Sequence, residues 1–336
     1  MEVGKFPASL LERILAKVDI SDPRVVVGPR VGEDTAVLQT SGSLLVAKSD
    51  PVTFATDQIG WYAVQVNAND VACTGGTPKW FLATLLVPER FTEDEAEAVF
   101  DQILEACRSI DVSLVGGHSE VTYGIDRPII MGTMLGDVEQ DKLILTGGAQ
   151  EGDSIVVTKG IAIEGTALLA REKASQLLQA GMSQEEIDKA ASLLSVPGIS
   201  VLYDARVACA SSQVHSMHDV TEGGLVTGLR EVAKASGLGL AIEESSVPIL
   251  SECQEVCEAL GLDPLGLLAS GALLITLPTA DVPGLLTSLE GEGINGFEIG
   301  TMIEAAEGLQ MVEFHGETPL PEFSRDELAR YMSSGA

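Results

Sequence analysis

The stretch that decides the fold of this chain is Asn69-Asp70-Val71-Ala72-Cys73-Thr74-Gly75-Gly76-Thr77-Pro78. It closes an apolar segment, residues 61–73, which predicts a helix ended by the glycine pair. The next residues, 80–87, are almost continuously apolar and predict a strand. Asp70 therefore lies within an otherwise apolar helix. A carboxylate in that position must be paired, hydrogen-bonded or metal-bound, because burying it bare costs several kcal/mol.

Strands and helices alternate on both sides of this stretch. Further strands are predicted at residues 43–48, 112–115 and 128–135. Thr92-Glu93-Asp94-Glu95 is a capping box and opens a helix. The apolar residues of this helix fall on one face, which predicts that they lie in the core: Ala96, Val99, Phe100, Ile103, Cys107 and Ile110.

A polar, glycine-containing stretch at residues 137–153 interrupts the pattern, and we place the domain boundary there. The alternation then restarts with predicted strands at 154–159 and 271–277 and predicted helices at 166–173, 184–194 and 224–235. The length of 336 residues favours two domains, at about 150 residues each. We predict two α+β domains, residues 1–140 and residues 150–336.

Composition narrows the range of partners. Fifty acidic against twenty basic residues give a formal charge of −30, and no run of Lys and Arg forms a local basic patch. Such a surface repels a phosphate backbone and an anionic membrane, so neither nucleic acid nor a membrane is expected as a partner. No secretion signal follows Met1, and the five cysteines are odd in number and widely spread. These features predict a cytoplasmic protein.

Acidic residues stand at the ends of several apolar segments. Asp34 lies in the run Gly32-Glu33-Asp34-Thr35-Ala36-Val37, and Asp50 follows the strand that is predicted to end at Lys48. Taken singly, each aspartate is most simply a cap or a solvated residue. Together with Asp70, they supply the hard oxygen ligands that a Mg²⁺ ion bridging phosphates requires.

Two glycine motifs strengthen a phosphate-binding hypothesis, although the P-loop and Rossmann signatures are missing from the sequence. Val115-Gly116-Gly117-His118 is expected to place bare backbone just past a strand, where amides can approach a phosphate. His218-Asp219-Val220-Thr221-Glu222-Gly223-Gly224-Leu225 is expected to be a polar turn leading into a helix, whose N-terminal N–H groups suit an anion. An ordinary capped helix start is the alternative for the second motif.

The ordered motifs at residues 32–37, 49–50, 69–78, 115–118 and 218–225 resemble those of the aminoimidazole-ribonucleotide synthase (PurM) superfamily. That superfamily also holds thiamine-monophosphate kinase, selenophosphate synthetase and the hydrogenase maturation protein HypE. The stretch 160–167, GIAIEGTA, looks most like the HypE-like branch. The resemblance implies a two-domain PurM-like fold, in which the N-terminal sheet forms a dimer barrel and the C-terminal domain is α/β. It also implies Mg-ATP bound in the groove between the domains.

The resemblance further implies roles for individual residues. Asp34, Asp50 and Asp70 match metal-binding aspartates, and Asp219 matches an acidic residue of the second domain, which would act in catalysis together with Asp50. The residues implied to lie around the nucleotide are Ser49, Asn69, Gly116, Gly117 and His118. Where the family often has an acidic residue, this chain has His118, so that a metal ligand is either absent or supplied by Glu120.

We therefore expect an ATP- and Mg²⁺-dependent homodimeric enzyme that activates an oxygen of a small-molecule substrate. HypE carries its carbamoyl group on a C-terminal cysteine, which this sequence lacks, and a maturation protein is expected as a further partner. Two alternatives stay open: a thiamine-monophosphate kinase-like phosphotransferase and a non-catalytic nucleotide-binding scaffold. Two pairs of residues could each hold a metal, His215 with His218 and Cys253 with Cys257. The alternative for each pair is a purely structural role.

Overall fold

The computed structural model describes residues 8–18, 20–29, 33 and 35–333, and these form two compact units. The N-terminal unit comprises Ile20–Gly28 and Asp34–Leu143, and the C-terminal unit comprises Met1–Asp19, Pro29–Glu33 and Ile144–Ala336. Helix α1 (Ala8–Leu15) therefore belongs to the C-terminal unit, where its Glu12 forms an ion pair with Lys234. The chain starts in the C-terminal unit, enters the N-terminal unit, passes back through the C-terminal unit at residues 29–33, completes the N-terminal unit and returns at residue 144.

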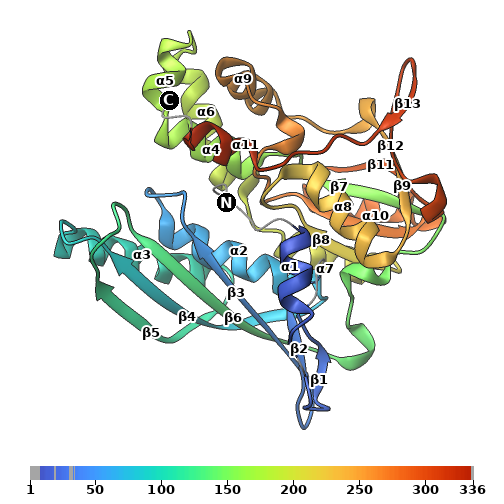
Figure 1. Cartoon of the computed structure of the whole chain (residues 1–336), viewed down its shortest axis with the longest axis horizontal. Coiled ribbons are helices and arrows are strands. Elements are labelled where there is room, and N and C mark those ends of the chain that lie inside the picture. The colour runs from blue at the N-terminus through green and yellow to red at the C-terminus, as the bar shows by residue number, and fades with distance from the viewer. Residues whose placement is uncertain (1–7, 19, 30–32, 34, 334–336) are drawn as a thin grey trace. The chain divides into compact units, whose positions relative to one another are not determined.

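The N-terminal unit contains a six-stranded sheet in the order β1-β2-β3-β6-β4-β5 (Figure 1). Neighbouring strands are antiparallel except β4 and β5, which are parallel. The strands are β1 (Val25–Val27), β2 (Ala36–Gln39), β3 (Leu44–Val52), β4 (Thr77–Val87), β5 (Ser113–Val121) and β6 (Ile129–Val138). The predicted strands are all present, and β3 and β5 extend well beyond the predicted ends.

Helices α2 (Ile59–Cys73) and α3 (Glu93–Ser109) pack against each other, and α2 lies on β3, β6 and β4. The strands beneath them alternate accordingly. In β4, Phe81, Ala83, Leu85 and Val87 are buried, whereas Leu82 and Leu86 are only partly covered and Trp80 is exposed. One face of the sheet is therefore packed by helices, and the other, which carries Trp80, Leu82 and Leu86 together with Thr84, is only partly covered by the residues that the structure describes.

The sheet of the C-terminal unit has seven strands in the order β13-β12-β9-β11-β7-β10-β8, with only β9 and β12 parallel. The strands are β7 (Asp153–Thr158), β8 (Ser216–Asp219), β9 (Gly239–Glu243), β10 (Leu273–Pro278), β11 (Gly296–Ile303), β12 (Leu309–Glu313) and β13 (Gly316–Pro319). Every residue of β7 is buried, so both faces of the central strands are covered.

Helix α8 (Gly224–Ser236) packs its apolar residues onto β7, β9, β10 and β11 in the main hydrophobic core of this unit. Helices α7 (Leu202–Ser211) and α10 (Val282–Gly291) pack together and contact β10 and β11. The remaining helices are α4 (Ile163–Glu172), α5 (Ala174–Gln179), α6 (Gln184–Ser192), α9 (Ser251–Leu260) and α11 (Glu327–Ser333). The mixed α and β architecture with two sheets confirms the predicted fold class.

The predicted capping box is present, because Thr92 accepts from the Glu95 amide while the Glu95 side chain accepts from the Thr92 amide. Cys107 is buried, as its position on the α3 stripe predicts. The prediction that Phe100 lies in the core is wrong. Its side chain is 36% exposed, because it lies at the border of the stripe formed by Val99 and Ile103.

One stretch, Gln184–Ser211, is long and apolar enough to pass for a membrane span by composition. The backbone does not continue as a helix through it. Val196 is extended (φ −140°, ψ 110°) before Pro197 and Gly198, which separate α6 from α7. Within its most apolar window of 18 residues, 39% is buried. Two short surface-packed helices account for its composition without a continuous span.

Candidate functional site

The carboxylates of Asp50 and Asp70 converge on one cation, the ammonium of Lys48. The Lys48 Nζ lies 3.2 Å from Asp50 Oδ2 and 3.1 Å from Asp70 Oδ1. Lys48 and Asp70 are almost fully buried, at 8% and 4% side-chain exposure, whereas Asp50 is 40% exposed. Lys48 and Asp50 are two residues apart on β3, so both point to the face that α2 covers. Asp70 reaches the same place from α2.

Asn67 fixes the backbone of Asp50 against α2. The Asp50 amide donates to Asn67 Oδ1 at 2.9 Å, and Asn67 Nδ2 donates to the Asp50 carbonyl at 3.3 Å. The same Nδ2 also donates to the Ala63 carbonyl, one helical turn earlier. Gly132 on β6 leaves the room for this side chain, because a Cβ there would lie 2.4 Å from Asn67 Nδ2. The separation of the two carboxylates is thus built into the packing of α2 on β3.

Ser49 and Asn69 lie next to these carboxylates in sequence but differ in environment. Ser49 is exposed on the opposite face of β3, and its hydroxyl donates to the Gly132 carbonyl at 2.8 Å. Asn69 is fully buried in α2. Asp34, the third predicted metal ligand, lies outside the described residues. Among the residues that the structure describes, no group of three or more His, Cys, Asp and Glu side chains could hold a metal.

Gly116, Gly117 and His118 lie on the edge strand β5. Gly117 occupies the same row across the sheet as Asp50 of β3. Gly117 pairs with Ala83 of β4, Ala83 with Gly132 of β6, and Gly132 with Asp50 of β3. The three strand spacings between Asp50 and Gly117 amount to about 14 Å. His118 is exposed and lies 3.3 Å from Glu120. These residues therefore share a row of the sheet with Asp50 but do not touch it.

The expectation that the glycine pair lies just past a strand is wrong. Gly116 and Gly117 are inside β5, which continues to Val121 because β4 offers pairing partners as far as Val87. Gly117 has φ +150°, and a Cβ there would lie 1.9 Å from the Ala83 carbonyl oxygen. At this position glycine is required by the close approach of two strands.

In the C-terminal unit, Asp219 ends β8 and is almost fully buried. The predicted turn follows, and α8 begins at Gly224, as predicted. Gly223 and Gly224 both have positive φ, and a Cβ on Gly224 would lie 2.5 Å from the Leu265 carbonyl oxygen. The N-terminus of α8 already faces an anion, since the Gly223 amide donates to the Asp326 carboxylate at 2.6 Å.

Asp326 belongs to a buried group of carboxylates together with Glu164. Burial raises the pKa of Asp326 to about 7, and the nearby Glu222 carboxylate adds to the rise. Burial likewise raises the pKa of Glu164 to about 7, although hydrogen bonding to Ser270 opposes the shift. The Oε2 of Glu164 has no hydrogen-bond partner among the described residues. Near neutral pH these side chains are poised between the acid and the carboxylate.

We expect Glu164→Gln to stabilise the protein at alkaline pH. Glu164 ionises near pH 4.5 when unfolded and near 7 when folded. Its contribution to stability is present below pH 4.5 and is lost as the pH rises to about 7, because only the unfolded state releases the proton. The variant should therefore match the wild type in unfolding free energy at pH 4 and exceed it at pH 8 by up to about 3 kcal/mol, with a correspondingly higher melting temperature. Glu185→Gln, at an exposed position of α6, is the control, and identical pH profiles for wild type and Glu164→Gln would contradict the assignment.

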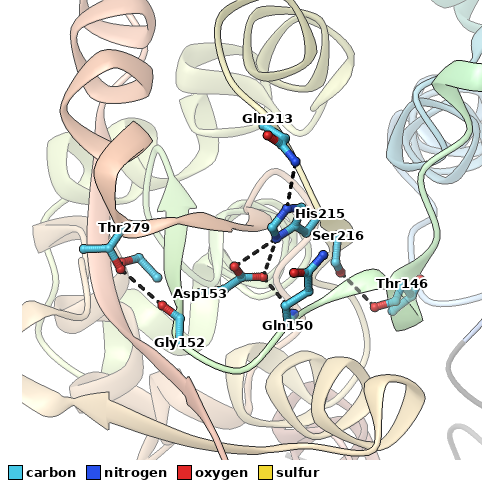
Figure 2. A network of polar contacts seen from close by, with 9 residues as sticks. Thr146, Gln150, Gly152, Asp153, Gln213, His215, Ser216 and Thr279 are labelled. Atoms are coloured by element: carbon cyan, nitrogen blue, oxygen red, sulfur yellow. Dashed lines mark hydrogen bonds and ion pairs between the residues drawn. The ribbon is translucent and has the colours of Figure 1, made fainter.

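The two histidines of the competing metal-site hypothesis have separate partners. His215 Nδ1 lies 2.9 Å from both oxygens of Asp153, whose Oδ2 also accepts from the Gln150 amide, and Gln213 lies on the far side of the ring (Figure 2). His218 Nε2 lies 3.0 Å from Glu231 of α8. Residues three apart on an extended strand point to opposite faces, so the two rings do not converge on one ion. This network ties β8 to the segment before β7.

Cys253 and Cys257 are buried one turn apart on α9, with a hydrogen bond between their thiols. Their surroundings are consistent with the structural alternative.

The sequence patterns did not indicate four residues of these sites: Lys48, Asn67, Glu164 and Asp326. Glu164 is the one acidic residue of the HypE-like stretch 160–167, and this place in the motif was a signal for it. A lysine in an apolar strand two residues before an aspartate was a signal for Lys48. Asp326 contacts a residue 103 positions away, and no local pattern could have revealed it.

The fold defines a two-domain α+β protein in which each domain is built on a mostly antiparallel sheet. Residues 32–138 match the family model for the N-terminal domain of AIR synthase related protein, and residues 150–311 match that for its C-terminal domain. The chain belongs to the AIR synthase-related (PurM) superfamily and to its HypE-like branch.

Several relatives support this assignment. A putative hydrogenase expression/formation protein of Methanocaldococcus jannaschii is 29% identical, over 95% of this chain and 96% of its own length. The carbamoyl dehydratase HypE of Cupriavidus necator is 30% identical, over 82% of this chain and 78% of its own. A thiamine-monophosphate kinase of Bacillus subtilis is 30% identical over 58% of each chain.

Solved structures have the same fold. HypE in complex with ATP superposes with a TM-score of 0.73 at 23% identity, covering 94% of this chain and 96% of the other. HypE from a HypE–HypF complex superposes with a TM-score of 0.75 at 19% identity, covering 94% and 100%.

Proposed function

We propose that this protein is a HypE-like enzyme that uses Mg-ATP to phosphorylate, and so activate, an oxygen of a small-molecule substrate. The observation that carries the proposal is the convergence of Asp50 and Asp70 on a single cation. Two relatives, a carbamoyl dehydratase and a thiamine-monophosphate kinase, and a HypE structure with ATP support the nucleotide.

The donor set fits a divalent cation. Asp50 Oδ2 and Asp70 Oδ1 both lie within 3.2 Å of one positive nitrogen, so that their hard oxygens already share a cation. Asp50 and Asp70 would hold Mg²⁺, together with Asp34 as the resemblance implies. Bound there, Mg²⁺ would neutralise the charge that develops on the transferred phosphoryl group.

The residues of this chain act by positioning and by electrostatics. Asn67 holds the Asp50 backbone through two hydrogen bonds, so the carboxylate does not shift when phosphates arrive. In the reaction the substrate oxygen forms a bond to the γ-phosphorus while the bond to the ADP oxygen breaks. Asp50 and, from the C-terminal unit, Asp219 are the carboxylates proposed to act in catalysis. Ser49, Asn69, Gly116, Gly117 and His118 are proposed to lie around the nucleotide.

We expect ATP with Mg²⁺ to raise the melting temperature and ATP with EDTA to do so much less. The carboxylates repel one another and the phosphates, and a divalent cation relieves both repulsions. Thermal-shift measurements at fixed ionic strength, with GTP as a specificity control, test this expectation. Equal shifts with Mg²⁺ and with EDTA would refute the metal assignment.

A phosphotransferase resembling thiamine-monophosphate kinase is the second candidate, since such a kinase is among the relatives. A non-catalytic scaffold is the third. ATP turnover measured with and without candidate acceptors separates them: phosphorylated acceptor identifies a kinase, and ATP binding without ADP formation under any condition favours the scaffold. A maturation protein is proposed as a partner, because a HypE structure contains HypF.

We propose that the cysteines of this chain carry no carbamoyl group. Cys73, Cys107, Cys253 and Cys257 are buried, and burial raises the pKa of the Cys107 thiol to about 11. Cys209 is exposed, but desolvation raises the pKa of its thiol. A thiol that is buried or stays protonated is a poor nucleophile. Intact-protein mass spectrometry after incubation with a carbamoyl-transferase partner, carbamoyl phosphate and Mg-ATP should show no adduct. A carbamoyl or cyano adduct mapped to any cysteine would contradict this.

A further inference from the structure

Lys48 is a buried cation whose role the proposed use of ATP leaves unexplained. On the same face of β3, the preceding residues Leu44 and Val46 are apolar and buried, Asp50 follows, and the Lys48 side chain is 8% exposed. A lysine in such a position must be paired, since an isolated ammonium is costly to bury. Its ion pairs with Asp50 and Asp70, at 3.2 Å and 3.1 Å, supply the pairing.

The ammonium contacts Asp50 Oδ2 and Asp70 Oδ1, so a divalent cation that binds these two oxygens must displace it. Mg²⁺ binds oxygen at about 2.1 Å and does not tolerate a positive group within the same ligand shell. Entry of the metal between Asp50 and Asp70 therefore requires Lys48 to withdraw. Once withdrawn, the ammonium needs a new anion, because this site is buried.

The net charge of the site indicates which anion can pair with the displaced Lys48 ammonium. Two carboxylates and one ammonium carry one negative charge together, and replacement of the ammonium by a divalent ion would leave Lys48 as an excess positive charge. A polyphosphate brings several negative charges with it, and ammonium groups bind phosphate as point charges. The site is then neutralised only when metal and nucleotide arrive together.

We propose that Lys48 competes with the divalent cation for Asp50 and Asp70 and passes to the phosphates when the nucleotide binds, so that metal and nucleotide enter the site together. This inference rests on the proposed use of Mg-ATP. It makes Lys48 a positioning residue for both ligands and gives the free protein a low affinity for the metal alone.

The test measures Mn²⁺ binding by electron paramagnetic resonance, without nucleotide and with a non-hydrolysable ATP analogue. The wild type should bind Mn²⁺ weakly alone and much more tightly with the analogue. Lys48→Met should bind Mn²⁺ alone roughly tenfold more tightly than the wild type, because the competing charge is gone. In the variant the gain from the analogue should shrink, since its phosphates lose their ammonium partner.

Two further variants keep the result interpretable. Lys79→Met removes a lysine paired with Asp137 at 2.6 Å in the same unit, and it should leave Mn²⁺ binding unchanged. Lys48→Gln removes the charge but keeps a hydrogen-bond donor, and it repeats the comparison if Lys48→Met fails to fold. Unchanged or weaker binding of Mn²⁺ alone in both Lys48 variants would overturn the inference. Failure of the proposed function looks different: the wild type would then show no effect of the analogue, whatever Lys48 does to the metal alone.

Discussion

Asp70→Asn is expected to abolish the Mg²⁺-dependent part of the ATP-induced rise in melting temperature and to lower ATP turnover by roughly two orders of magnitude or more. Asp70 is 4% exposed and shares one cation with Asp50. Asparagine keeps the shape of the side chain but removes the charge that would hold a divalent ion. Without it, the remaining carboxylate faces the metal alone, and the phosphates lose the cation that bridges them to the protein.

The matched control for this variant is Asp137→Asn. Asp137 is an aspartate of the same unit, paired with Lys79, and lies outside the proposed site. It should keep both the thermal shift and turnover. Far-UV circular dichroism and the melting temperature without ligand establish that Asp70→Asn is folded. Turnover within a few-fold of the wild type in a folded Asp70→Asn protein would exclude Asp70 as a metal ligand.

Leu82→Glu is expected to convert a homodimer into a monomer. On β4, Trp80, Leu82 and Leu86 face away from α2, and they are exposed or only partly covered within the chain. Met131 on the neighbouring strand β6 is 45% exposed. Large apolar side chains on a partly covered sheet face indicate a protein partner, and a second copy of the chain would bury them symmetrically. A charge at the centre of such an interface costs several kcal/mol.

Sedimentation equilibrium at micromolar concentration measures this effect. The wild type should sediment as a dimer and Leu82→Glu as a monomer. Leu178→Glu changes an exposed leucine of α5, in the other unit, and should remain dimeric. A wild type that is monomeric at micromolar concentration would refute the dimer.

The sequence was sufficient where local rules decide the structure. The glycine pair after Cys73 ends α2, the Thr92 capping box opens α3, and the paired glycines at 223–224 open α8. The superfamily could be identified because its motifs are short, local stretches of sequence of the same kind. Strand ends were harder to predict, since β5 runs on through Gly116 and Gly117 only because β4 continues beside it.

The environment of Asp50 and Asp70 could not be predicted from the sequence, because it too depends on contacts between distant segments. The burial of Lys48 depends on α2 covering β3, and the place of Asn67 depends on the absence of a side chain at Gly132, 65 residues later. The carboxylate at the start of α8 comes from Asp326, 103 residues away from Gly223. Such contacts are set by tertiary packing and leave no periodic trace in the chain.

The path of the chain has a consequence for dissecting the protein. Helix α1 belongs to the C-terminal unit, so the N-terminal unit is inserted within its host, and the chain passes between the two units four times, the last time at residues 143–144. Cutting the chain once near residue 144 would sever only the last of these connections and would leave α1 on the fragment that contains the inserted unit. The two fragments could therefore remain associated through α1 after proteolysis. A truncation beginning at residue 144 would instead lack a piece of its own domain. Separate expression of the two units calls for α1 to be rejoined ahead of residue 144 by a short linker.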